Sequence, residues 1–411
     1  MDAAFEKLAL PVRNPYCICF AINLLVVNFR LHDVPFRRMA YLLIEIVPTK
    51  RRDGRLRCFY SLRGGFAIKR LVADKLKAFG VDEIATGIGQ TGVVGVIRGK
   101  TNNSGKVIGL RADMDALPLE EITGKPYAST IPGKMHACGH DGHTAMLLGA
   151  AKYLAETRNF DGTAVVIFQP AEEGGAGAKA MIEDGLMDRF GIQEVYGMHN
   201  LPGAPVGTFH IRPGSIMAAA DRLRIEIEGT GCHAAKPHEG VDTILVGAHI
   251  VQAVQSIASR NTDPLKSVVV SLTTFNAGFT DNVIPQTAVL RGTVRTLDPE
   301  IRDLAEARLK QIVPTIAEAF GAKATIHYKR DYPITSNHEA QTEFAAGIAR
   351  EIAGADNVDT DVPPTMGGED FSFMLQERPG AFIFAGNGDT AMLHHPAYDF
   401  NDELIPVGCS Y

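Results

Sequence analysis

Apolar residues recur with two different periods along the chain from about residue 67 onward. Short apolar runs at 92–98, 106–111 and 163–168 predict buried strands, whereas segments such as 69–79 and 143–155 have the spacing of helices. A helix at 176–186 and a strand at 194–198 continue the series. Strands and helices that follow one another in this way are typical of a layered α/β domain with a largely parallel sheet.

The pattern changes near Pro213. Within 221–229, Leu223, Ile225 and Ile227 alternate with charged residues, which predicts a strand with one buried and one solvated face. The pattern therefore indicates a second kind of sheet, in which only one face is covered.

The second region has the element order β-α-β-β-α-β, which is that of a ferredoxin-like unit. Asp298 is predicted to cap one of its helices, with Pro299 at the first helical position. The α/β pattern then resumes with a helix near 342–353 and a strand at 381–385. We therefore expect an α/β/α domain formed by residues 1–214 and 331–411, with an α+β domain of residues 215–330 inserted into it. The elements expected in the insertion are strands at 221–229, 267–275, 287–296 and 323–329 and helices at 243–259 and 298–320.

Composition narrows the class of protein. A chain of 411 residues with 45% hydrophobic residues can bury two ordinary cores, so global disorder is excluded. The net charge is only −6 and the basic residues are dispersed, which indicates a small-molecule substrate rather than nucleic acid. The apolar run 17–29 is shorter than the roughly 20 residues of a membrane helix, so no membrane partner is expected.

Cysteine usage favours a reducing compartment. The six cysteines are too few and too irregular for a disulfide framework, and one lies within a histidine-rich motif. We expect a cytoplasmic protein whose thiols serve metal binding or catalysis. The cysteines are residues 17, 19, 58, 138, 232 and 409.

The segment 135–143 crowds three histidines, a thiol and a carboxylate into nine residues. Capping of the following helix by Asp141 is the plainer explanation. Thiolate and imidazole are, however, the preferred ligands of zinc-like ions, so Cys138 beside His140 favours a metal site. A thiolate can bridge two cations, which makes Cys138 the candidate for a bridging ligand.

Other candidate ligands follow predicted strands. Glu172 and Glu173 come just after an apolar strand, and adjacent side chains in extended backbone point to opposite sides, so one can bind metal while the other faces substrate. His199 follows another strand, and His394 lies near the C-terminus. Loops after strands form the active-site crevice of open α/β sheets.

Two carboxylates stand at alternate positions where another strand is predicted to end. Asp113 and Asp115 are suited to orient ligand histidines, although a turn that favours aspartate explains them equally well.

Seven motifs in the order of one family run from about residue 69 to the C-terminus: RADMDALP, MHACGHDGHTAMLLGAA, FQPAEEGGAGAKAM, GMHN, NVIP, MGGEDFS and LHHPAYDFND. Together they resemble the hippurate hydrolase and aminoacylase-type amidohydrolases, which include the plant auxin-conjugate hydrolases, within the glutamate-carboxypeptidase-like metallopeptidase superfamily. The resemblance implies a catalytic domain with two divalent metal ions, manganese or zinc before nickel or cobalt, and an inserted lid domain through which two subunits pair. The substrate would be an N-acyl-L-amino acid.

The resemblance also assigns roles to residues. Glu172 would be the general base, which takes a proton from water and gives it to the leaving amine. His233 would reach into the partner subunit's site and stabilise the oxyanion. Asn282 and Arg295 would hold the substrate's α-carboxylate. The metal ligands would be Cys138, His140, Glu173, His199 and His394.

The N-terminal region departs from this family. Residues 1–66 lack the family's usual opening and have little periodicity, which suggests a divergent or frame-shifted segment that packs poorly. The helix that commonly follows the last motif is expected to be shortened.

Two alternatives remain open at this point: a dipeptidase or biosynthetic deacetylase with the same metal site, and a catalytically silent metal-binding or dimerisation protein. A free base and an oxyanion donor argue against the silent protein, because a structural metal site needs neither.

Overall fold

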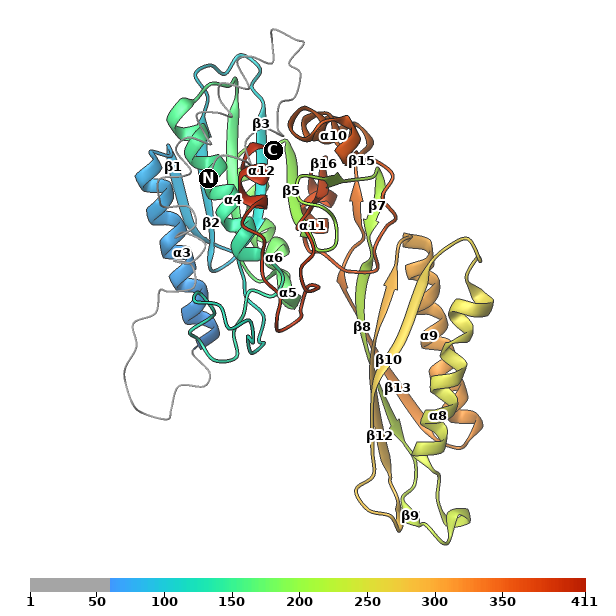
Figure 1. Ribbon diagram of the computed structural model, residues 1–411. Coiled ribbons are helices and arrows are strands. Elements are labelled where there is room, and N and C mark those ends of the chain that lie inside the picture. The colour runs from blue at the N-terminus through green and yellow to red at the C-terminus, as the bar shows by residue number, and fades with distance from the viewer. Residues whose placement is uncertain (1–59) are drawn as a thin grey trace.

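The computed structural model describes residues 60–411, which form two units built on separate sheets (Figure 1). The apolar run 17–29 and nearly all of the atypical region 1–66 lie outside the described residues. An eight-stranded sheet dominates the first unit and a four-stranded sheet the second. The predicted fold class, an α/β catalytic domain with an inserted ferredoxin-like domain, is confirmed.

The large sheet has the strand order β1-β2-β4-β3-β5-β16-β6-β15. Its four central strands, β4, β3, β5 and β16, are parallel, but β1, β2 and β6 run antiparallel to a neighbour, so the sheet is mixed rather than largely parallel. Strand β1, which the sequence pattern did not predict, forms a hairpin with β2. The strands are β1 (Glu83–Ile88), β2 (Gly92–Arg98), β3 (Val107–Asp113), β4 (Thr163–Gln169), β5 (Glu194–Leu201), β6 (Phe209–His210), β15 (Val358–Asp359) and β16 (Gly380–Gly386).

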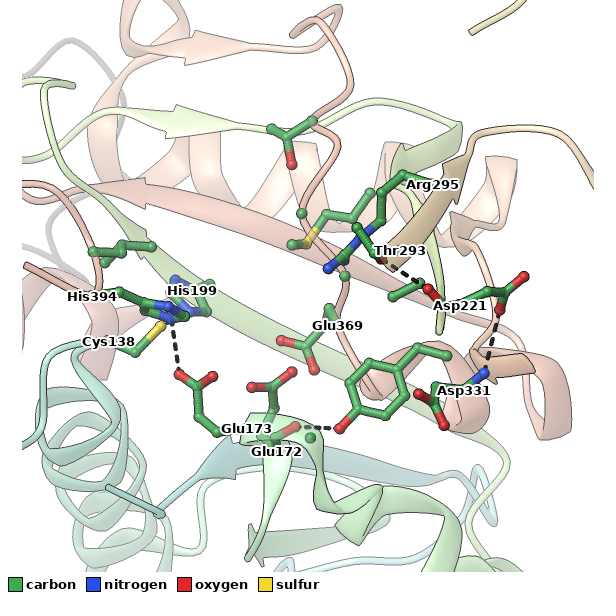
Figure 2. Close-up of a pocket in the computed structure, with 18 of the residues that line it drawn as sticks. Cys138, Glu172, Glu173, His199, Asp221, Thr293, Arg295, Asp331, Glu369 and His394 are labelled. Carbon is green, nitrogen blue, oxygen red and sulfur yellow. Dashed lines mark hydrogen bonds and ion pairs between the residues drawn. The ribbon is translucent and has the colours of Figure 1, made fainter. Parts of the chain in front are cut away.

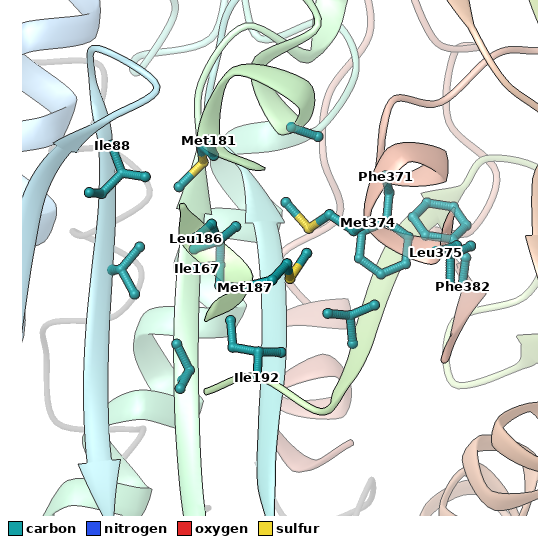
Figure 3. Close-up of a cluster of buried hydrophobic side chains, with 14 of the residues drawn as sticks. Ile88, Ile167, Met181, Leu186, Met187, Ile192, Phe371, Met374, Leu375 and Phe382 are labelled. Carbon is teal, nitrogen blue, oxygen red and sulfur yellow. The ribbon is translucent and has the colours of Figure 1, made fainter. Parts of the chain in front are cut away.

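Helices cover both faces of this sheet because its central strands are apolar on both sides. In β4, Val166 and Phe168 pack toward α3 and α4, whereas Val165 and Ile167 pack into a cluster with α6, α7 and α11 (Figure 3). This arrangement buries the whole central strand, as expected for parallel strands between two helical layers. The helices of this unit are α3 (Tyr60–Phe79), α4 (His140–Thr157), α5 (Glu172–Gly175), α6 (Gly177–Glu183), α7 (Leu186–Arg189), α10 (Glu339–Ala353), α11 (Phe371–Glu377) and α12 (Leu404–Ser410), with a 3-10 turn at Ala355–Asn357.

The helix predicted at 176–186 is interrupted. Helix α6 ends at Glu183, and Gly185 adopts a φ of 85° before the short helix α7 begins. A left-handed residue cannot continue an α-helix, so the apolar spacing that predicted one helix spans two.

The second sheet has the order β10-β12-β8-β13, and all its neighbours are antiparallel. Leu223, Ile225 and Ile227 of β8 are buried beneath the helices, while intervening residues such as Arg224 are exposed, as the alternation predicted. The Asp298 carboxylate accepts a hydrogen bond from the backbone N–H of Glu300, which confirms the predicted cap. The elements are β8 (Ala219–Glu228), α8 (Thr243–Val254), a π-helical turn (Ile257–Asn261), β10 (Val268–Ala277), β12 (Thr287–Thr296), α9 (Pro299–Ala319) and β13 (Lys323–Tyr332).

Short strand pairs mark the two ends of the second unit. Where the chain leaves and re-enters the first unit, β7 (Gly214–Met217) pairs with β14 (Thr335–Asn337). At the far tip, β9 (Cys232–His233) pairs with β11 (Val283–Ile284), followed by a 3-10 turn at Pro237–Glu239 (Figure 1). Among residues 60–411, none of the helices has the length and apolar character needed to span a bilayer.

Candidate active site

A cavity of about 550 Å³ lies where the two units meet, beside the carboxyl ends of the central parallel strands (Figure 2). Its lining combines residues of the first unit, among them Cys138, Glu172 and His394, with residues of the second, such as Arg295. The carboxyl edge of a parallel sheet is where α/β proteins place their sites, because loops from several strands converge there.

Four of the five side chains predicted as metal ligands line this cavity, and the fifth, His140, is buried beside Cys138 and Glu173. Atoms of Cys138, His140 and Glu173 that can bind metal lie within 4.8 Å of one another. The Cys138 Sγ is 3.5 Å from Nε2 of His199, and Nε2 of His394 is 3.0 Å from Oε1 of Glu173 (Figure 2). The fold therefore brings together a thiol, three imidazoles and a carboxylate that are spread from residue 138 to residue 394.

The chemistry of these groups suits divalent cations. Nε2 of His140 is buried without a hydrogen-bond partner, and Oδ2 of Asp113 lies 3.7 Å away, beyond hydrogen-bonding distance. Burial, reinforced by the neighbouring His143, lowers the pKa of His199 well below its usual value, so its imidazole is neutral, as a ligand must be. Burial raises the pKa of the Cys138 thiol to about 12, so a cation must displace its proton. The residues present thus fit a metal centre.

Asp115 holds both a candidate ligand and the loop that carries the glutamates. Its Oδ1 lies 3.2 Å from Nδ1 of His140, and its carboxylate accepts hydrogen bonds of 3.0 Å from the backbone N–H groups of Glu172 and Glu173. An Nδ1–carboxylate contact orients a ring so that its Nε2 faces the metal.

Asp113 has a different partner from the one expected. Its Oδ1 lies 2.6 Å from Nδ1 of His143, which is not among the predicted ligands. The backbone N–H of Asn200 donates to Nε2 of His143 at 3.1 Å, so both ring nitrogens are engaged. Asp113 thus fixes a supporting histidine beside the candidate ligands.

Gly139 allows the tight entry into α4 that presents His140. Its φ is 87°, and a Cβ atom there would lie 2.4 Å from Oδ1 of Asn200. Any other residue would therefore strain the backbone and clash with the network beneath the cluster.

The sequence analysis overlooked a buried ionic cluster next to Glu172. Arg111 contacts the carboxylates of Asp113, Glu369 and Asp370 at 2.7, 2.8 and 3.1 Å. Burial, together with the charges of Glu369 and Asp370, raises the pKa of Glu172 well above its usual range, as suits a group that must take up a proton. Two features of the sequence could have predicted this cluster: Arg111 lies inside an apolar strand, and Glu369 and Asp370 are adjacent in the motif MGGEDFS.

The predicted carboxylate-binding pair is divided between two places. Arg295 lines the cavity, half-buried, with its Nε donating to Oγ1 of Thr293 at 3.1 Å. Asn282 lies at the far tip of the second unit, where its backbone oxygen accepts a hydrogen bond from the backbone N–H of Ala234. His233 is exposed in β9, which pairs with β11 directly after Asn282. Among the described residues of one chain, the cavity lining includes neither Asn282 nor His233. A single chain therefore does not join Asn282 to Arg295.

Comparison with known proteins gives consistent results. A sequence profile described as "Peptidase family M20/M25/M40" matches residues 109–411. The chain is 46% identical to a hippurate hydrolase of Campylobacter jejuni, covering 83% of this chain and 88% of that protein. It is 44% identical to an N-acetyl-L-cysteine deacetylase of Bacillus subtilis, covering 84% and 81%. A solved Bacillus subtilis structure described as a dinuclear metal-binding peptidase of the M20 family superimposes with a TM-score of 0.75 at 32% identity, covering 91% of this chain and 94% of that one.

Proposed function

The chain belongs to peptidase family M20/M25/M40 and is an amidohydrolase, and we propose that it cleaves the amide bond of N-acyl-L-amino acids to a carboxylic acid and a free amino acid. The observation that carries the proposal is the meeting of Cys138, His140 and Glu173 beside a cavity that Glu172 also lines. The identities of the relatives do not favour a dipeptidase or a catalytically silent protein.

We assign the metal-holding role to the five gathered side chains and take two divalent ions per subunit as the resident cofactor. When bound, such ions supply Lewis acidity and activate water. Manganese or zinc is our first choice, and nickel or cobalt is compatible with the same mixed donors. The proposed ligands are Cys138, His140, Glu173, His199 and His394.

Glu172 acts as the general acid–base group. The residue is only 7% exposed, and the backbone N–H of Asp370 donates to its Oε1 at 3.4 Å. A carboxyl group with a raised pKa takes a proton from water and then delivers it to the leaving nitrogen, which departs as an amine. Arg295, half-buried and without a carboxylate partner in the described ion pairs, is suited to receive the substrate's α-carboxylate.

We further propose that residues 215–330 act as a lid that pairs two subunits, while residues 1–214 and 331–411 form the catalytic domain. His233 and Asn282 share the tip of the second unit, away from the cavity of their own chain, and this supports the proposal that they act in a partner's cavity. In that position His233 would donate to the oxyanion and Asn282 would contact the substrate.

A cytoplasmic location completes the proposal. Cys138, Cys232 and Cys409 are all free among the described cysteines, and a thiolate ligand persists best where thiols stay reduced.

The main experiment assays metal-loaded protein against a panel of N-acyl amino acids and dipeptides. We expect turnover of acyl amino acids that a chelator abolishes and manganese or zinc restores. Glu172→Gln should keep its metal and lose about 10²- to 10⁴-fold in kcat. Activity only on dipeptides would support the dipeptidase alternative, and a Glu172→Gln enzyme as fast as the wild type would refute the role of Glu172.

The lid's action across subunits is tested by mixing two inactive variants, Glu172→Gln and His233→Ala. Random exchange makes half of the molecules mixed dimers, each with one intact site if His233 acts on the partner, so about a quarter of wild-type activity should return. No recovery after subunit exchange would place His233 outside the partner's site.

A further inference from the structure

The loop that carries Glu172 and Glu173 has an unusual backbone. Ala171, Gly174 and Ala176 have φ values of 55°, 83° and 54°, so two alanines occupy the left-handed region that glycine normally fills. L-residues adopt this region only where surrounding contacts impose it. The loop therefore depends on contacts from outside itself.

Two side chains, those of Asp115 and Tyr332, supply those contacts. Asp115 accepts the backbone N–H groups of Glu172 and Glu173, as described above. The hydroxyl of Tyr332 donates to the backbone oxygen of Glu172 at 2.5 Å and accepts from the backbone N–H of Ala176 at 3.2 Å. Tyr332 thus bridges the beginning and the end of the loop.

Tyr332 is itself held firmly. It is the last residue of β13, in the sheet of the second unit, and its backbone oxygen accepts a hydrogen bond of 3.1 Å from Arg302 of α9. Its ring packs edge-on against Phe373 with 6.1 Å between centroids, and the residue is only 7% exposed. Burial raises the pKa of its phenol, so the hydroxyl remains a donor.

We propose that Tyr332 is a positioning residue for the reaction, a role that rests on the function proposed above. Its hydroxyl fixes the backbone of Glu172. Tyr332 ends β13, the strand from which the chain returns to the first unit. Without the hydroxyl, the Glu172 oxygen and the Ala176 N–H lose their partner, and the loop no longer holds the carboxylate in place. Substrate binding through Arg295 does not depend on this contact.

The test compares Tyr332→Phe with Tyr328→Phe. Tyr328 lies on the same strand, and its hydroxyl donates to Oδ2 of Asp221 at 2.6 Å instead of contacting the loop. The first measurement is amide hydrogen exchange of the metal-free proteins. Tyr332→Phe should accelerate exchange at Ala176, with little change at the N–H groups that Asp115 holds, and Tyr328→Phe should leave the loop as in the wild type.

The second measurement is steady-state kinetics per metal-loaded site. Tyr332→Phe should lower kcat by about 10- to 100-fold with KM within about twofold, because the general base is misplaced while substrate contacts persist. Tyr328→Phe should keep wild-type kcat and KM. A purely structural role would lower the melting temperature and leave kcat per loaded site unchanged.

The proposal is overturned if exchange at Ala176 is unaltered in Tyr332→Phe, if both variants alter the loop equally, or if kcat per loaded site stays at the wild-type value. Wild-type protein that turns over no member of the substrate panel would refute the proposed function instead. Hydrogen exchange would then still decide whether Tyr332 holds the loop.

Discussion

Replacing Arg111 by methionine is expected to destabilise the protein by about 3–5 kcal/mol, because the change strands buried carboxylates. The guanidinium is fully buried, and the side chains of Asp113, Glu369 and Asp370 that surround it are at most 2% exposed. Methionine keeps much of the side-chain volume and removes the charge. The loss of stability therefore measures the ionic contacts rather than the cost of a large cavity.

The expected loss of stability is the difference between the ionic attraction that is removed and the relief that comes when the carboxylates take up protons. A unit pair about 4 Å apart contributes roughly 4 kcal/mol at an effective dielectric constant of about 20, so three pairs would exceed the expected loss. Burial raises the pKa of both Glu369 and Asp370, so these groups take up protons when the arginine is absent, which relieves part of the cost. At about 2–4 °C per kcal/mol for a domain of this size, the melting temperature should fall by roughly 6–20 °C.

Thermal unfolding followed by far-ultraviolet circular dichroism measures the change, and Arg330→Met is the matched control. Arg330 contacts the carboxylates of Asp303 and Glu306 at 2.7 and 2.6 Å, but its side chain is 45% exposed, so its loss should cost less than about 1 kcal/mol.

The pH dependence gives a second check on Arg111. Raised carboxyl pKa values in the folded variant mean that it binds more protons than the unfolded chain, so the variant gains stability as the pH falls. Its deficit should therefore be smaller near about pH 5 than near about pH 8. An Arg111→Met protein that melts within about 2 °C of the wild type, or no lower than Arg330→Met, would refute the reasoning.

Three further predictions concern separate parts of the molecule. Burial raises the pKa of the metal-free Cys138 thiol to about 12, so zinc binding must release its proton. Zinc affinity, measured by competition with a chelator, should therefore rise at least about tenfold per pH unit between roughly pH 6 and 8. An affinity that does not change with pH would exclude a thiolate ligand. Asp161 accepts hydrogen bonds from Thr101, Asn103 and Ser104, and these bonds lower the pKa of its carboxyl group. In acid-unfolding titrations, Asp161→Asn should therefore be less stable than the wild type above about pH 4, and the two should converge as the pH falls further. A difference that stays constant with pH would contradict this. Leu309→Ala should lower the free energy of unfolding by about 2–5 kcal/mol in denaturant titrations, since Leu309 is fully buried in the core of the second unit. A loss below about 1 kcal/mol would contradict this, because it would mean that the core collapses around the gap.

Much of the fold could be predicted because burial imposes a local period on the chain. The alternation of Leu223, Ile225 and Ile227 predicted β8 and its buried face, and Asp298 predicted the start of α9. Strand direction is different. The antiparallel direction of β2 escaped prediction because a short apolar run is the same in either direction, whereas β1 and β6 have no such run and were not predicted as strands.

For the candidate site as well, some features could be predicted from the sequence and others could not. Residue chemistry was enough to nominate Cys138, His140 and one of the two adjacent glutamates, since thiolate, imidazole and carboxylate near strand ends suit a metal whatever the details of packing. The family resemblance selected Glu173 rather than Glu172 as the ligand. Their meeting point, and the partners that hold them, depend on segments far apart in the chain. Arg111 meets Glu369 across 258 positions, and Tyr332 meets the Glu172 loop across 160.

The sequence by itself determined which residues are apolar, which can bind metal and where most of the strands and helices form, because these properties belong to side chains and to neighbours along the chain. Only the tertiary structure decided that Asn282 lies at the far tip of the second unit, away from Arg295. It alone also decided that Arg111 meets Glu369 and Asp370 and that the Tyr332 hydroxyl contacts the backbone of Glu172. The reason is physical: a hydrogen bond or ion pair requires atoms to come within about 3 Å, and between distant segments that proximity is set by packing of the whole chain.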